Sequence, residues 1–238
     1  MDKRFLTPEV IHALDPFFER IETELQPING KRIVIWPAAI EGLAFRLAAK
    51  IGNGHVTAIA PDSDRKKGLK ERIKAEGLMD RLEIVHTRRW PMQHIPHRMD
   101  QSDAFLDTSE LFSTNEMWLS MDVSELMVSA IRPGGYYLYF IGVTQKPVMK
   151  DVEMAFGSLG FDLHQDGTKE VLEGLRSEGF TDVAAIDITD LLIPAWTLCR
   201  GHPRFEEDVQ NFIWLLHDPE TRLGLSCSFF IVKGTKAE

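Results

Sequence analysis

The sequence lacks the features that mark several classes of protein. Among its 238 residues are only two cysteines, Cys199 and Cys227, and their positions match neither a zinc-binding pattern nor a disulfide framework. It has no uninterrupted apolar run of about 18 residues, the length that a membrane-spanning helix requires. A formal net charge of -9 argues against a protein whose task is to neutralise nucleic-acid phosphates. We therefore expect a cytoplasmic protein with two free thiols and no membrane segment.

What the sequence does contain is typical of a folded domain. Hydrophobic residues make up 44% of the chain and charged residues 26%, close to the average for globular proteins. This proportion is sufficient for a sizeable core. Since α/β units of this length often form one domain, we expect a single domain over residues 1–238.

Short apolar runs alternate with stretches of helical periodicity along the chain. The expected strands are 32–36, 55–60, 82–87, 102–108, 136–143, 181–189 and 225–235, and the expected helices between them are 43–51, 63–78, 116–131, 148–161 and 169–180. Strands that alternate with helices form parallel sheets covered on both faces. The pattern predicts an α/β fold with a doubly wound, mostly parallel, seven-stranded sheet.

Two segments lie outside this alternation. Residues 1–30 form an N-terminal helical extension, in which an amphipathic helix over 7–26 begins at Thr7-Pro8 and can be interrupted at Pro16. Residues 190–224 form an insertion before the last strand that is longer than an ordinary connection. We expect the insertion to have structure of its own and to act as a lid or an interface.

The order of these pieces resembles the class I S-adenosylmethionine-dependent methyltransferases. The resemblance is strongest over residues 31–143, and it is carried by KAEGLMDRLEIVHTR at 74–88, IRPGGYYLYF at 131–140, LRSEGFTDVAAIDIT at 175–189 and LSCSFFIVKG at 225–234. It implies a Rossmann-like sheet of seven strands. It also implies that S-adenosylmethionine binds beside the turn after the first strand.

The turn after the first strand differs from the family pattern. Family members carry an acidic residue on this strand and then G-x-G-x-G, because glycines let the backbone approach the ligand closely. The matching stretch here, IWPAAIEG from Ile35, retains only Gly42. The resemblance places Trp36, Pro37, Ala38 and Gly42 at the cofactor.

Two further cofactor positions are also altered. The carboxylate that binds the ribose hydroxyls in the family is matched by Ala60, with Asp62 two positions further on, and the acidic residue near the adenine amine is matched by Arg88. Each lost charge-assisted hydrogen bond costs roughly 1.5 to 3 kcal/mol. Binding in the usual pose is therefore expected to be weakened, unless backbone groups, apolar walls or stacking on Trp36 or Trp90 replace these contacts.

Two carboxylates follow the fourth expected strand. Asp107 and Glu110 lie where open α/β sheets place their ligands, and either can orient or deprotonate a methyl acceptor as a general base. The alternative interpretation is that they belong to the capped first turn of the helix over 116–131.

Three functions remain open at this point. The first is a methyltransferase that acts on a small molecule or a protein. The second is a non-catalytic scaffold or regulatory subunit, in which Trp36, Pro37 and Arg88 close the cofactor pocket. The third is a site for a different, anionic ligand held by Arg88 and Arg89. The expected partners are a substrate or another subunit, in a homo- or hetero-oligomer, and not nucleic acid.

Overall fold

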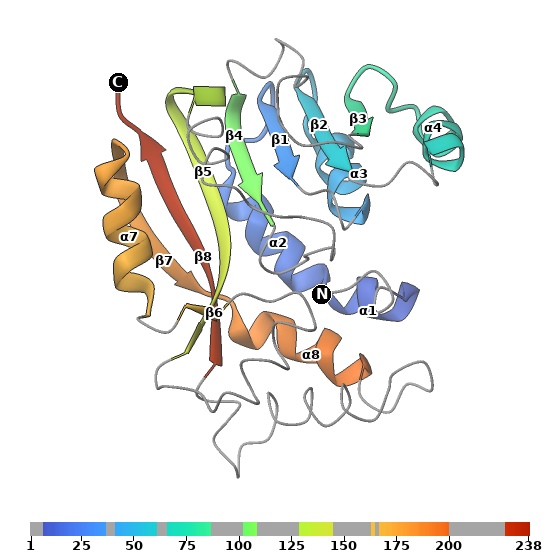
Figure 1. The fold of residues 1–238 in the computed structure, drawn as a ribbon. Helices are drawn as coiled ribbons and strands as arrows, with labels where there is room; N and C mark the ends of the chain where they lie inside the picture. Colours follow the sequence, from blue (N-terminus) through green and yellow to red (C-terminus); the bar gives the residue numbers. More distant parts are fainter. Residues whose placement is uncertain are drawn as a thin grey trace.

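The computed structural model describes residues 7–36, 41–60, 66–86, 102–108, 129–144, 163–164, 167–199 and 227–238 (Figure 1). The strands are β1 Arg32–Trp36, β2 His55–Ala60, β3 Leu82–His86, β4 Ser102–Asp107, β5 Ile131–Thr144, β6 Leu163–His164, β7 Phe180–Asp187 and β8 Cys227–Lys236. The helices are α1 Pro8–Ala13, α2 Asp15–Glu24, α3 Glu41–Lys50, α4 Lys66–Ala75, α7 Thr168–Ser177 and α8 Thr189–Cys199. No helix in these ranges is long and apolar enough to cross a membrane.

In the described ranges, the strands form one sheet in the order β3-β2-β1-β4-β5-β8-β7, and the short β6 pairs with β5 outside this path. Strands β1 to β5 are parallel to one another, whereas β8 runs antiparallel to both β5 and β7. The predicted doubly wound, mostly parallel sheet of seven strands is thus confirmed. The two-residue β6 lies in a segment for which only a connection was predicted.

Most expected strands agree with the observed ones within one or two residues, but β5 begins earlier than predicted. The helix expected over 116–131 lies outside the described residues except for its last three, and there Ile131 already pairs with Ser102 of β4. Pro133 lacks an amide donor and Gly134 has φ +74°, so the chain cannot continue as a helix through this segment. The pairing therefore resumes at Ala104 and Tyr136 after a shift in register.

The N-terminal segment forms two helices, as the position of Pro16 suggested. Thr7 caps α1 by accepting a hydrogen bond from the Val10 amide at 3.4 Å. Helix α2 begins at Asp15, directly before Pro16, which has no amide hydrogen to donate to the preceding turn. The interruption therefore follows from the absence of one backbone donor.

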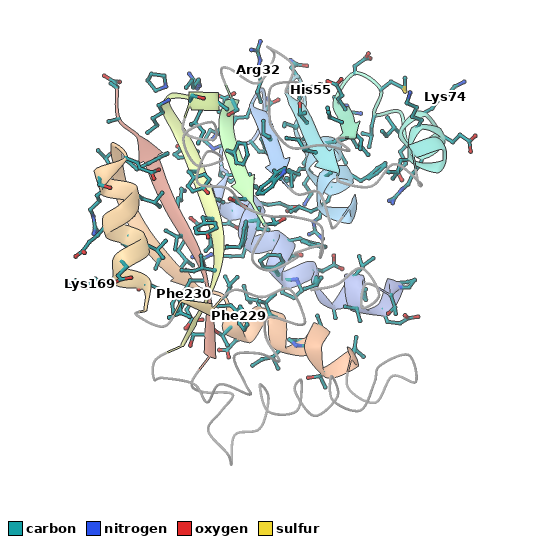
Figure 2. The ribbon with its side chains drawn as sticks, in the orientation of Figure 1. Arg32, His55, Lys74, Lys169, Phe229 and Phe230 are labelled. Carbon is teal, nitrogen blue, oxygen red and sulfur yellow. The ribbon has the colours of Figure 1, made fainter. Side chains whose placement is uncertain are left out.

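The sheet has an apolar core on each face. Successive residues of β8 illustrate this: Phe229 belongs to the core under α1, α2, α3 and α8, and Phe230 packs against the core on the side of α7 (Figure 2). Strands buried on both faces are typical of doubly wound folds. Figure 1 shows α7 beside β7 and β8 at one side of the sheet and α4 next to β3 at the other.

Charged side chains attach α2 to α3. Glu22 of α2 is buried and accepts hydrogen bonds from Arg46 and, at 2.7 Å, from Lys50, both on α3. Arg46 also donates to Asp15 at 2.6 Å. Burial acts to lower the pKa of Arg46. The hydrogen bond and the charge of Glu22 outweigh this effect, together with the charges of Asp15 and Glu19, and the pKa is raised. The guanidinium therefore stays charged between the two helices.

Two lysines attach the end of α2 to the sheet. The Lys31 ammonium donates to the Leu25 carbonyl at 3.0 Å and the Lys233 ammonium donates to the Glu24 carbonyl at 2.7 Å. Both ammonium groups lie over the ring of Tyr136, at 4.4 and 4.7 Å from its centroid. Burial lowers the pKa of Lys31, Asp103 opposes the shift, and Lys233 adds to it. Cations at a helix C-terminus stabilise its unpaired carbonyls.

The segment predicted as an insertion begins with α8. In the described part this helix contacts both α1 and α2, which brings the N-terminal extension and the start of the insertion together. Residues 200–224, the rest of the predicted insertion, lie outside the described residues.

The turn into β2 requires glycine at position 54. A Cβ atom there would lie 2.2 Å from the Lys31 carbonyl oxygen and 2.6 Å from Cγ1 of Ile51. We predict that Gly54→Ala lowers the free energy of unfolding by about 3 kcal/mol, because backbone has to move to make room. Gly174 on α7 has no atom within 4 Å of such a Cβ, and Gly174→Ala should instead stabilise the protein by up to about 1 kcal/mol. Urea unfolding of both variants checks this, and an equal effect of the two would contradict it.

Candidate functional site at the carboxyl edge of the sheet

The candidate site lies where β1 and β4 end side by side. From β1 the chain proceeds through α3 to β2 and β3, which lie on one side of β1 within the sheet. Strands β4 and β5 lie on the other side of β1. In open α/β sheets, ligands bind outside the carboxyl ends of the strands at this reversal of strand order. Figure 1 shows that the carboxyl ends of β1, β2 and β4 point toward the part of the molecule where α1 and α8 lie. We call this region the carboxyl edge.

Asp107 and Trp36 are the last residues of β4 and β1, and they are paired in register. The Thr108 amide donates a hydrogen bond to the Trp36 carbonyl at 2.7 Å, so pairing of the two strands continues beyond Asp107. Asp107 is only 3% exposed. The backbone on both sides of this buried carboxylate is thereby fixed.

The neighbouring strand supplies a hydrogen-bond donor to the carboxylate. The Tyr137 hydroxyl of β5 donates to Oδ2 of Asp107 at 3.0 Å. Asp107 pairs in register with Tyr139, so Tyr137 reaches it diagonally across the two strands. Because a tyrosine side chain is long, it can span this separation. Asp107 therefore has one donor from a residue that the sequence did not single out.

The Tyr137 ring is held by other aromatic rings. It stacks on Tyr139 with 5.9 Å between centroids and 19° between planes, and it contacts Phe180 at 5.8 Å and Phe105 at 6.2 Å. Aromatic pairs at such separations add to the stabilisation from burial. Their packing restricts the ring, and with it the position of the hydroxyl at Asp107.

The first strand presents apolar side chains to both cores. Trp36 is 4% exposed and belongs to the core on the α7 face, together with Val34 and Ile59. Ile35, which begins the stretch matched to the family motif, belongs to the opposite core and is also fully buried. Neither of these two positions of β1 thus supplies a carboxylate. The role of Trp36 toward a cofactor stays a prediction.

The remaining predicted site residues are only partly described. Gly42 lies in the first turn of α3, where an added Cβ would be 3.6 Å from Cγ2 of Ile11, so α1 lies directly beside the start of α3. Ala60 ends β2 and pairs with His86 of β3. Outside the described residues lie Pro37, Ala38, Asp62, Arg88 and Glu110. The structure therefore brings Trp36 and Asp107 together and leaves these five as predictions.

No group of three or more histidine, cysteine, aspartate or glutamate side chains within the described ranges is placed to hold a metal ion.

Comparison with known proteins gives a match in structure only. No family model matches the chain, and no curated protein matches it in sequence. The structure of geranyl diphosphate methyltransferase in complex with SAM superposes with a TM-score of 0.71 at 15% identity, over 93% of this chain and 85% of the other. This chain has the class I methyltransferase fold.

Other solved structures that match this chain are of differently named proteins. Phosphoethanolamine N-methyltransferase 2 of Haemonchus contortus gives a TM-score of 0.67 at 12% identity over 94% of this chain and 53% of its own. The [4+2]-cyclase SpnF gives 0.65 at 14% identity over 94% and 81%. The resemblance noted in the sequence is confirmed at the level of fold, and the fold alone does not fix the reaction.

The hydrogen bond between Tyr137 and Asp107 leads to a stability prediction. Tyr137→Phe removes the donor and keeps the ring, so we expect the free energy of unfolding to fall by about 2 kcal/mol, because the buried carboxylate loses a partner. Tyr136→Phe, at the next residue and on the opposite face, is the matched control and should change stability by less than about 0.5 kcal/mol. Chemical denaturation at pH 7 measures both, and equal losses would show that the hydrogen bond is not the cause.

Proposed function

We propose that this chain binds S-adenosylmethionine at the carboxyl edge and transfers its methyl group to a small molecule or a protein. The support comes mainly from Asp107, a buried carboxylate at the end of β4 beside the reversal of strand order. The fold is also that of geranyl diphosphate methyltransferase in complex with SAM.

A buried carboxylate needs a physical reason to be there. Removing a charged group from water costs several kcal/mol, and an apolar residue would fill the same space in a core without that cost. Fully buried aspartates are rare in proteins unless they have partners. Asp107 lies at the edge where a ligand of this fold is expected, and not in the middle of a strand.

The chemistry asks little of the protein beyond binding and orientation. When bound, S-adenosylmethionine supplies an electrophilic methyl group: the acceptor forms a bond to its carbon, and the carbon–sulfur bond breaks with its electron pair moving to sulfur. Holding the acceptor in line with that bond lowers the barrier by proximity. Asp107 and Glu110 are the candidates to orient the acceptor or take its proton.

A second candidate function is a non-catalytic scaffold that binds a partner subunit. It is favoured by the apolar, buried side chains of Ile35 and Trp36 and by alanine at the end of β2, where the resemblance implies acidic contacts to the cofactor. In this case the carboxyl edge holds no adenosyl ligand.

Titration calorimetry with S-adenosylmethionine and S-adenosylhomocysteine separates the two functions. The methyltransferase proposal expects heat of binding with a dissociation constant of at most about 1 mM, accompanied by a rise in the unfolding temperature. No binding of either compound at several times that concentration would contradict the proposal and favour the scaffold.

Restoring the missing carboxylate should strengthen binding. We predict that Ala60→Asp raises the affinity for S-adenosylhomocysteine by about tenfold, because its carboxylate can accept hydrogen bonds from both ribose hydroxyls. Ala60→Asn has nearly the same size and no charge, and it should give a smaller gain. An unchanged affinity in a folded Ala60→Asp protein would mean that the ribose does not lie at the end of β2.

A further inference from the structure

Strands β3 and β7 lie at the two ends of the sheet, and their outer edges differ. In β7 the register shifts between Thr181 and Ala184, and Asp182 has φ +51°, so a bulge interrupts this strand. Bulges and charges of this kind hinder the pairing of a further strand. Strand β3, in contrast, pairs with β2 in unbroken register from Leu82 to His86. Its outer edge therefore has the regular geometry that another strand can continue.

The backbone groups of β3 that face away from β2 follow from the hydrogen bonding of the pair. The Val56 amide of β2 donates to the Arg81 carbonyl at 2.8 Å. The bonds from one strand of a parallel pair come from alternate residues, so Arg81, Glu83 and Val85 face β2. Within the described ranges, β2 is the one strand that neighbours β3. The amide and carbonyl of Ile84 thus point to the open edge of the sheet.

Apolar side chains accompany this edge. Ile84 and Val85 are half-buried, and Ile84 packs against the core on the side of α2 and α3. Met79, in the turn before β3, is 62% exposed. An extended segment alongside β3 would cover part of this apolar surface in addition to pairing with the backbone.

The part of the sequence that contains α4 and β3 is basic, although the whole chain is acidic. Residues 65–98 include ten lysines and arginines but four aspartates and glutamates, a formal charge of +6 in a chain of -9. Lys70, Arg72 and Lys74 of α4 are exposed. Arg72 pairs with Glu76 at 2.6 Å, whereas Lys70 and Lys74 form no ion pair in the described part of the chain. Figure 2 shows Lys74 on α4, at the end of the sheet where β3 is the last strand.

We infer that the outer edge of β3 is a docking surface for an acidic polypeptide segment of another protein, which adds to the sheet as an extended strand. Its backbone pairs with the amide and carbonyl of Ile84, and its carboxylates are attracted by Lys70 and Lys74. This surface goes beyond the proposed function, because it lies at the end of the sheet and does not require S-adenosylmethionine.

An acidic segment suits this surface better than two other occupants. Nucleic acid presents phosphates over a wide area, and the chain outside residues 65–98 has a formal charge of -15, which repels them. A second copy that paired through its own β3 would place the same positive charges on both sides of the contact. A narrow acidic strand meets the basic helix and avoids both kinds of repulsion.

The first test uses a pair of fluorescent peptides with the full-length protein. The probe is a peptide of about nine residues in which valine and glutamate alternate, and in the control peptide lysine replaces each glutamate. Fluorescence anisotropy should give a dissociation constant of at most about 1 mM for the acidic peptide at low salt, and binding of the lysine peptide at least about tenfold weaker. The amide resonances of β3 should shift in the NMR spectrum with the acidic peptide.

A proline variant tests the backbone contact. Ile84→Pro removes the outward amide donor and leaves the ladder to β2 unbroken, because proline is tolerated where the amide faces away from the neighbouring strand. We expect it to weaken the acidic peptide by at least about fivefold, the equivalent of one lost hydrogen bond. Ile84→Val keeps the donor and a similar side chain, and as the matched control it should change the affinity by less than about twofold.

A pair of lysine variants tests the charge without touching β3. Replacing Lys70 and Lys74 together, by Lys70→Gln and Lys74→Gln, should weaken the acidic peptide about fivefold, and added salt should reduce this difference. Lys169→Gln on α7, at the other end of the sheet, should leave the affinity unchanged. Thermal unfolding of every variant verifies that it is folded.

Several results would contradict the inference. No binding of the acidic peptide at about 3 mM would do so, as would equal binding of the two peptides or equal affinity of the wild-type protein and folded Ile84→Pro. If sedimentation shows that the protein alone is a dimer and that Ile84→Pro is a monomer, the edge is occupied by a second copy and the inference is wrong.

Discussion

The burial of β1 and β4 on both faces is the constraint on which the rest of the structure depends. Residues 33–36 of β1 and 104–107 of β4 are all nearly inaccessible to solvent. Strands of this kind need helices on both faces of the sheet. The connections that contain these helices place β2 next to β1 and β5 next to β4, so that β1 and β4 form the central pair. The strand ends at Trp36 and Asp107 are therefore side by side, and the one charged group among these residues lies at that end.

The N-terminal helices depend on charged contacts as much as on apolar packing. Glu22 and its two cations attach α2 to α3, and Lys31 and Lys233 attach the last turn of α2 to the amino end of the sheet. Helix α2 is held at both places, and α1 lies beside the first turn of α3. Helix α8 contacts α1 and α2. The extension and the start of the insertion are thereby positioned next to the carboxyl edge.

The strands and most of the described helices could be predicted because they follow from local patterns such as RIVIW at 32–36 and the proline at position 16. The position of Asp107 at a strand end was predicted in the same way. Its contact with Tyr137 was not, because that pair depends on the register of β4 and β5, which shifts between Ser102 and Ala104. The burial of Glu22 was also missed, since it arises from the packing of α2 on α3 and not from either helix alone.

The most direct measurement is a crystal structure of the protein grown with millimolar S-adenosylhomocysteine. The account predicts a ligand at the carboxyl ends of β1 and β4, beside Trp36 and Asp107. A ligand-free edge in which side chains of the chain itself occupy that place would contradict the account and identify the protein as a scaffold with a methyltransferase fold.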